Sequence, residues 1–433
     1  MKKLIHKLQE KKWLLWGITS FHAVFLIVAV LFYNRLPFAL GDEVTLIEMT
    51  SIMKNTLFKV EEKPPKERFL FINCAWEKDL IPKLDEYGWE IGKIDITDRN
   101  SLGKFVQKIN RTNAHELLLM DIQFYMPTAN DSVLAAELPK LKKGLVSYHK
   151  GADNKPRYPI FKGIPLGLSD MESQLRSNQD DLVLKYHLIQ GDSLKTTPLR
   201  MYEEIHQDTL EHGLFFNSLG GYPILNAYII EHPIRKNDLF NKVDSLRYPY
   251  MHLSEVINIS DKRFAKIVKD KVIVLGDFEN LDIHRTIYGK QPGPLILVNA
   301  FLALENGDNR ITYAFLLFMF IGFAFASYKA IVYKDPVTTF LERKLSTDHF
   351  LLELTRDTLF YLVFFGIMSL VSYFFFNMHL TILVLSFYLN GLEQLMIFLH
   401  GEEDENQEDK QEREGQIQSE IPVEVETVDR KDV

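Results

Sequence analysis

The chain has 433 residues and a formal net charge of −8 at pH 7. Residues 401–433 carry thirteen Asp and Glu against four Lys and Arg, a net charge of −9, so the rest of the chain is close to neutral. It lacks the concentrated basic stripe of a nucleic-acid-binding surface, and we expect no nucleic-acid partner. Cys74 is the single cysteine, which excludes an intramolecular disulfide and leaves burial to stabilise the fold.

Four apolar segments interrupt an otherwise globular composition. They cover residues 13–33, 311–332, 358–376 and 380–399. Each is close to the ~17–25 residues that a helix needs to cross a bilayer, where it satisfies its own backbone hydrogen bonds. We therefore predict four transmembrane helices. A cleaved signal peptide is the alternative for the first segment, but its apolar core is long and lacks a clear small-x-small cleavage site.

Lysine and arginine residues near these segments predict the orientation. Lys residues are frequent before the first segment, and Lys and Arg are frequent between the second and third, whereas the turn at 377–379 has neither. Such residues accumulate in cytoplasmic loops. Residues 1–12, 333–357 and 401–433 are therefore expected in the cytoplasm. Residues 35–310 are then expected outside the membrane, with both termini in the cytoplasm.

The large polar region alternates apolar strands with amphipathic helices. In chain order, we predict a helix at 43–58, a strand at 68–73, a helix at 79–87, a strand at 91–96, a helix at 98–109, a strand at 116–124, a helix at 131–143 and a strand at 145–148. Strands and helices that alternate at this spacing are typical of βαβ units. The fold class predicted for residues 35–310 is therefore α/β, with a mixed or parallel sheet and flanking helices.

The pattern continues less regularly after a turn-rich stretch. We predict further strands at 182–189, 223–230 and 271–275, and helices at 198–212 and 293–305. The last helix runs toward the second apolar segment.

Two stretches carry a resemblance to a known family. The first covers Leu118–Phe124 and residues 130–138, and the second covers Lys271–Asp277 with Asp282, Thr286, Pro292-Gly293-Pro294 and Val298-Asn299-Ala300. Residues 252–257 fit the same pattern. In this order, over roughly residues 43–306, they resemble the second type of CHASE domain, an extracellular sensory domain of bacterial cyclases and histidine kinases.

The resemblance implies a sensor of a bacterial inner membrane, with its large domain in the periplasm, one span before it, three after it and an effector inside the cell. Asn73-Cys74 departs from the acidic residue that usually ends the family's first strand. The 33 residues at 401–433 are too few and too charged for a catalytic domain. We therefore expect a separate cytoplasmic protein partner, contacted by an amphipathic loop at 333–357 and by a disordered acidic tail at 401–433.

Polar residues that follow two strands are the candidate ligand-binding site. Asp277, Asp282, His284 and Arg285 come after one strand, and Asp121 and Asp131 flank the end of another. In α/β sheets, ligands bind beyond the carboxyl ends of the strands. Aspartates are also common in helix caps and turns, so a purely structural role is the alternative.

The sequence contains no motif that predicts catalysis, a cofactor or a metal site. His206 and His212 are six residues apart and miss the i, i+4 spacing of a zinc pair on a helix. The segment at 217–221 lacks the G-x-S-x-G pattern of a nucleophile elbow. We therefore expect a protein that is not an enzyme.

Three polar residues are predicted to lie within the membrane. They are His22 in the first segment and Asn390 and Glu393 in the fourth. An ionisable group there costs ~2.5–3.5 kcal/mol at the membrane centre and usually faces other protein. Lys329 is a candidate partner for Glu393. The alternatives are that Glu393 reaches the membrane surface and that His22 hydrogen-bonds within the bundle.

We interpret the chain as a membrane-anchored extracytoplasmic sensor. It would bind a small-molecule or protein ligand outside and pass a signal to the cytoplasmic partner. The alternative is a structural scaffold whose outer domain binds another envelope protein. A pocket with titratable residues would favour the sensor, and a flat apolar surface would favour the scaffold.

Overall fold

A computed structural model describes residues 12–34, 41–54, 58, 63–84, 87, 89–171, 182–191, 193–332 and 350–398. The chain forms two compact units. The helical unit comprises Met1–Ala29, Leu316–Met368 and Thr381–Val433, and the α/β unit comprises Val30–Phe315 and Ser369–Leu380. The predicted partner-binding segments at 333–349 and 401–433 lie outside the described residues, and residues 350–357 begin a helix.

A sheet of seven strands forms the centre of the α/β unit. Its order is β14-β1-β15-β4-β5-β6, with β7 also pairing with β5. The strands are β1 (Phe69–Asn73), β4 (Leu117–Met120), β5 (Gly144–Lys150), β6 (Pro156–Arg157), β7 (Leu166–Leu168), β14 (Tyr250–His252) and β15 (Val272–Gly276). Every pairing is parallel except that of β5 with β6. This confirms the predicted α/β class and mixed sheet.

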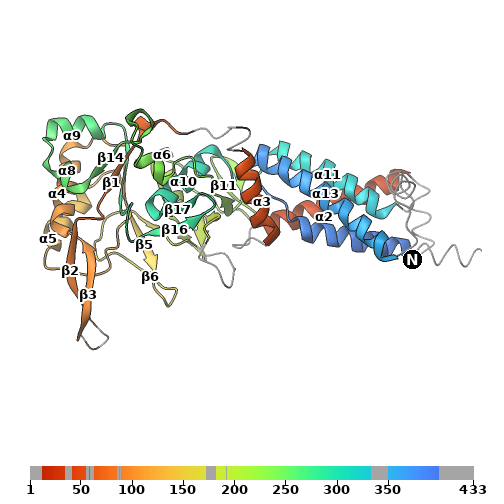
Figure 1. The fold of residues 1–433 in the computed structure, drawn as a ribbon, viewed down its shortest axis with the longest axis horizontal. Coiled ribbons are helices and arrows are strands. Elements are labelled where there is room, and N and C mark those ends of the chain that lie inside the picture. The colour runs from red at the N-terminus through yellow and green to blue at the C-terminus, as the bar shows by residue number, and fades with distance from the viewer. Residues whose placement is uncertain are drawn as a thin grey trace, which may run out of the picture. The chain divides into compact units, whose positions relative to one another are not determined.

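Helices cover both faces of this sheet because its strands are apolar on both sides (Figure 1). Phe69 and Phe71 of β1 face the layer of α6 (Thr197–His206) and α10 (Gly293–Asn306). Leu70 and Ile72 face the layer that contains α4, α5, α8 and α9. Those helices span Arg99–Thr112, Asp131–Glu137, Leu253–Asn258 and Asp261–Val268.

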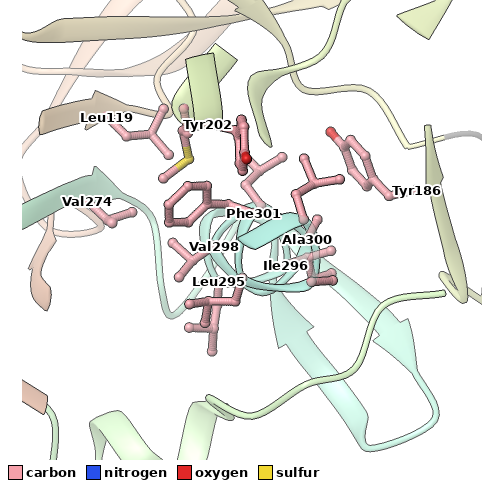
Figure 2. Close-up of a cluster of buried hydrophobic side chains, with 14 of the residues drawn as sticks. Leu119, Tyr186, Tyr202, Val274, Leu295, Ile296, Val298, Ala300 and Phe301 are labelled. Atoms are coloured by element: carbon pink, nitrogen blue, oxygen red, sulfur yellow. The ribbon is translucent and has the colours of Figure 1, made fainter. Parts of the chain in front are cut away.

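The core beneath α10 is closely filled (Figure 2). Leu295, Val298 and Phe301 of the helix are fully buried, together with Leu119 of β4 and Val274 of β15. The helix ends at Gly307, whose φ of 76° favours glycine. The predicted helix at 293–305 is thus confirmed, and it fixes the loop before it against the carboxyl edge of the sheet.

The predicted helix at 79–87 is wrong. The segment instead forms β2 (Lys78–Leu84), which pairs antiparallel with β3 (Glu90–Thr97), and Ile81 lies opposite Ile94. Pro82 stands in the middle of β2, where a helix would lose a backbone hydrogen bond. The strand predicted at 91–96 exists, but it belongs to this separate hairpin and not to the main sheet (Figure 1).

The remaining elements are short. The helix predicted at 43–58 is α3 (Gly41–Ile52), and the one predicted at 198–212 ends at His206 because Gln207 is left-handed, with φ 53°. The strands predicted at 182–189 and 223–230 become parts of two-stranded sheets. These smaller strands are β8 (Lys185–His187) with β13 (Ala227–Ile229), β9 (Ile189–Gln190) with β10 (Leu194–Lys195), β11 (Asn217–Leu219) with β12 (Tyr222–Ile224), and β16 (Ile283–Thr286) with β17 (Gly289–Pro292).

Three helices among the described residues are long and apolar enough to cross a membrane. They are α2 (Lys12–Tyr33), α11 (Tyr313–Ile331) and residues Thr358–Phe376 of α13 (Phe350–Phe376). The fourth predicted segment is a shorter apolar helix, Ile382–Phe398. It begins later than predicted, because the chain turns at 377–381. Three spans are therefore supported, and the fourth stays a prediction.

Candidate functional site: a crevice at the carboxyl edge of the sheet

Two adjoining cavities lie at the edge of the sheet where β4, β5 and β15 end. Their volumes are about 220 and 240 Å³. Both are lined by Asp121, Gln123, His149 and Asp282. We refer to these two cavities and their lining residues as the crevice. Carboxyl ends of parallel strands are the usual place for a ligand in an α/β sheet, and the position agrees with that rule.

Four of the six predicted site residues line the crevice. Asp121 and Asp282 line both cavities, Asp277 lines the first and His284 lines the second. Gly293 explains why Asp282 can lie there, because a Cβ atom at Gly293 would come within 1.9 Å of its Oδ2 atom. The strand end at Asp121 and the loop before α10 are thus brought together although they are remote in sequence.

The other two predicted residues lie outside these two cavities. The Asp131 carboxylate lies 3.4 Å from Nε of Arg99, which is fully buried, and accepts hydrogen bonds from both the backbone and the hydroxyl of Thr128. Asp131 thus has a purely structural role, which is the alternative that the sequence left open for these aspartates. Arg285 is exposed on β16, opposite Lys290 of β17.

Sequence reasoning missed a second histidine–aspartate pair. Nδ1 of His149, in β5, lies 3.0 Å from Oδ1 of Asp170. The second Asp170 oxygen accepts a hydrogen bond from the backbone N–H of Lys150, at 2.5 Å. Asp170 follows β7, which pairs with β5, so this parallel pairing brings the two side chains together. The position of His149 directly after the predicted strand at 145–148 was the available signal.

The two histidines are both biased toward the charged form. Nε2 of His284 lies 2.7 Å from Oδ1 of Asp282, and this hydrogen bond raises the pKa of His284 despite its partial burial. Burial lowers the pKa of His149, but the hydrogen bond to Asp170 and the nearby aspartates outweigh it, so that pKa is also raised. The crevice therefore contains charge-assisted pairs.

Asp277 combines an ion pair with a structural role. Its Oδ2 atom lies 3.5 Å from Nζ of Lys78, the first residue of the hairpin. Its Oδ1 atom accepts hydrogen bonds from the backbone N–H groups of Glu279 and Asn280, which fix the turn after β15. Replacing this residue would disturb the backbone as well as the crevice.

Two aspartates of the crevice, Asp121 and Asp277, have a buried carboxylate oxygen without a hydrogen-bond partner among the described residues. The Asp277 oxygen lies 3.5 Å from Nζ of Lys78, whereas the Asp121 oxygen, Oδ1, has no such ion pair among these residues. Burial, and then the charge of Asp282, raise the pKa of Asp121 to about 6, although His149, Ser147 and Ser169 act in the opposite direction. A buried acceptor without a donor costs free energy, which a bound donor would recover.

A second polar cluster lies in the α/β unit, and two of its residues are close in sequence to α11 and α13. Lys54 is buried, and its Nζ atom lies 2.5 Å from Glu231 and 2.7 Å from Oδ1 of Asn377. Asn377 donates in turn to Asp308 at 2.6 Å. Burial, and then the charge of Glu231, raise the pKa of Asp308 to about 7. We call these four residues the base cluster.

The turn beside the base cluster is held by a buried histidine. Nε2 of His379 lies 3.2 Å from the hydroxyl of Thr50, and Nδ1 lies 2.9 Å from that of Ser369. Burial lowers the pKa of His379 to about 3, so the ring is neutral. Through these contacts α3 is bonded to the 377–379 turn, which directly follows α13.

The polar residues predicted within the membrane all have partners in the helical unit. Lys329 Nζ lies 2.6 and 2.8 Å from the two carboxylate oxygens of Glu393. His22 contacts the hydroxyl groups of Ser327 and Tyr388, at 2.8 and 2.9 Å. The side chain of Asn390 donates to Thr358 at 2.6 Å. These pairs compensate the cost of placing polar groups in an apolar setting.

No group of three or more His, Cys, Asp or Glu side chains in the described part of the chain could hold a metal ion. Comparisons with protein-family models, with curated proteins and with solved structures find no match to this chain.

Proposed function

We propose that this protein is a membrane-anchored receptor of the CHASE-like kind. It binds a small molecule in the crevice, on the periplasmic side of a bacterial inner membrane, and passes the signal to a separate cytoplasmic protein. The observation that carries this proposal is Asp121, a carboxylate with a buried, unpartnered oxygen at the ligand-binding edge of an α/β sheet. Apolar helices on both sides of the domain in the sequence support the membrane anchor.

The crevice has the properties of a binding site. Cavities of about 220 and 240 Å³ far exceed the ~30 Å³ that one water occupies in the liquid. Titratable residues converge on them from several strands, and perturbed titratable groups are common at functional sites. Three separate pairs, His284 with Asp282, His149 with Asp170 and Lys78 with Asp277, hold these side chains in place. The site is therefore preorganised, and ordering its side chains on binding costs little.

The base cluster offers a route for the signal. It joins Lys54, Glu231 and Asp308 of the outer domain to Asn377, which directly follows α13. A ligand that favours one arrangement of the domain would shift this junction through its differential affinity for two states. The turn at 377–379 would then move the ends of the helices on either side of it.

One observation favours the scaffold alternative. The β2–β3 hairpin and its approach expose five large apolar side chains, with 58–82% of their surface accessible. They are Trp76, Leu80, Tyr87, Trp89 and Ile91. Exposed apolar groups of this kind often mark protein interfaces. A scaffold would require the hairpin for function and would tolerate changes in the crevice.

A ligand screen separates the two functions. Full-length protein in detergent micelles should be stabilised by at least one compound in a panel of amino acids, amines, sugars and organic acids. Ligand at a hundred times its Kd adds about 2.7 kcal/mol to the free energy of unfolding. The Asp282→Ala variant should lose this stabilisation, because its carboxylate lines both cavities.

The matched control is Arg285→Ala, which changes an exposed neighbour outside these cavities. It should keep the stabilisation. Equal loss in both variants, or no stabilising compound in the panel, would argue for the scaffold.

A further inference from the structure

We propose that the ligand of the crevice is a small organic cation, a primary amine or a guanidinium, whose N–H groups bind the Asp121 carboxylate. This inference rests on the receptor function proposed above and adds the chemical class of the ligand. The charges, the hydrogen bonds and the dimensions of the site support it.

The charges of the crevice leave Asp121 without a cation of its own. Asp282 is paired with His284, and Asp170 with His149. Asp277 is paired with Lys78. When both histidines are protonated, these three pairs are neutral. Asp121 and Asp95, an exposed residue that also lines the first cavity, are then the excess negative charges, and a cationic ligand balances them.

Hydrogen bonding indicates the same class. The hydroxyl groups of Ser147 and Ser169 lie near the Asp121 carboxylate and favour its charged form, but its buried Oδ1 atom accepts no hydrogen bond from a described residue. An ammonium or guanidinium group supplies several donors together with the charge. An anionic ligand would meet the repulsion of Asp121 and Asp282, and an uncharged polyol would leave the charge uncompensated.

The position of Asp121 limits where the cation lies. Asp121 and Asp282 line both cavities, and their mutual repulsion is one reason why Asp121 holds a proton more readily than usual. A cation between them relieves that repulsion. The body of the ligand can extend into either cavity, and volumes of about 220–240 Å³ each restrict it to a small metabolite.

The test uses full-length protein in detergent micelles and four probes that differ in charge. These probes are 1,4-diaminobutane, agmatine, 1,4-butanediol and succinate. Isothermal titration calorimetry at pH 7.5 should show binding of an amine or of agmatine, and at least tenfold weaker binding of the diol and of succinate. Asp121→Asn should weaken the amine at least tenfold. Asp153→Asn removes the same charge from an exposed loop and should leave binding unchanged.

The pH dependence gives an independent readout. A proton and the cation compete for the Asp121 carboxylate, whose neighbours are Asp282, His149, Ser147 and Ser169. Amine affinity should therefore fall by up to tenfold per pH unit below about pH 6. Residues 401–433 can attract amines nonspecifically, but all variants share them, so the difference between variants reports the crevice.

The outcomes separate the chemical class of the ligand from the receptor function. If the diol or succinate binds more tightly than the amines, and Asp282→Ala abolishes that binding, the proposal of a cationic ligand is wrong and the receptor function stands. Amine binding that Asp121→Asn leaves unchanged would also overturn the proposal, because the cation would lie elsewhere. No binding of any probe would overturn the cation, and the wider panel described above would then test the receptor alone.

Discussion

Replacing Lys54 with methionine should destabilise the α/β unit by about 3–5 kcal/mol, the usual cost of breaking a buried ion pair by removing one partner. Methionine keeps much of the side-chain volume but leaves Glu231 without its cation and Asn377 without its donor. Asp308, in contact with Asn377, adds a second buried carboxylate to the same site. The midpoint of denaturant unfolding in detergent micelles measures this effect.

Lys63→Met is the matched control. Lys63 also pairs with a carboxylate, Asp238, at 2.6 Å, but 44% of its side chain is exposed. Exposed pairs contribute about 0–1 kcal/mol, so this variant should be close to wild type. Equal effects of the two substitutions would show that the base cluster is no more important than a surface ion pair, and would remove the route proposed for the signal.

Replacing Asp121 with asparagine should stabilise the protein above pH 7 while it removes ligand binding. The folded-state pKa of about 6 lies above the ordinary value of 3.8. Below pH ~4 the carboxyl is protonated in both states, and its contribution favours the folded state. That contribution is lost as pH rises through about 6. The full shift corresponds to about 3 kcal/mol, and partial solvation reduces the expected gain to about 1–2 kcal/mol.

Thermal unfolding at pH 8 and pH 4 measures this effect. The melting temperature of Asp121→Asn should exceed that of wild type at pH 8, and the difference should disappear at pH 4. Asp131→Asn should have the opposite sign, because it weakens the partner of the buried Arg99 guanidinium. A destabilised Asp121→Asn variant at pH 8 would mean that this carboxylate supports the fold, against the role proposed for it.

The sequence predicts elements well where one physical signal dominates. The strands at 68–73 and 271–275 are continuous apolar runs, which only a buried strand or a buried helix explains, and their length favours the strand. At 79–87, the apolar residues Leu80, Ile81 and Leu84 fit either periodicity. The pairing of this segment with β3 decided the outcome, and Pro82 was the local sign against a helix.

Part of the candidate site was also predictable, because one general rule applies to it. The rule for carboxyl ends of strands brings Asp121, Asp277 and Asp282 to one edge without knowledge of the register. The His149–Asp170 pair required the pairing of β5 with β7, and the base cluster required four segments from distant parts of the chain. Neither has a local pattern. Asp121 and Asp131 both flank the end of one predicted strand. Only the contacts of their side chains in the structure show that Asp121 lines the crevice and that Asp131 pairs with Arg99.

Hydrogen–deuterium exchange of the full-length protein in lipid nanodiscs, with and without the tightest-binding compound, tests the receptor most directly. We expect slower exchange at 121–126 and 277–284, where the ligand binds. We also expect a change at 377–379, where the base cluster meets the turn after α13, and loss of both effects in Asp282→Ala. Protection confined to the β2–β3 hairpin, or protection of the crevice with no change at 377–379, would contradict the receptor function.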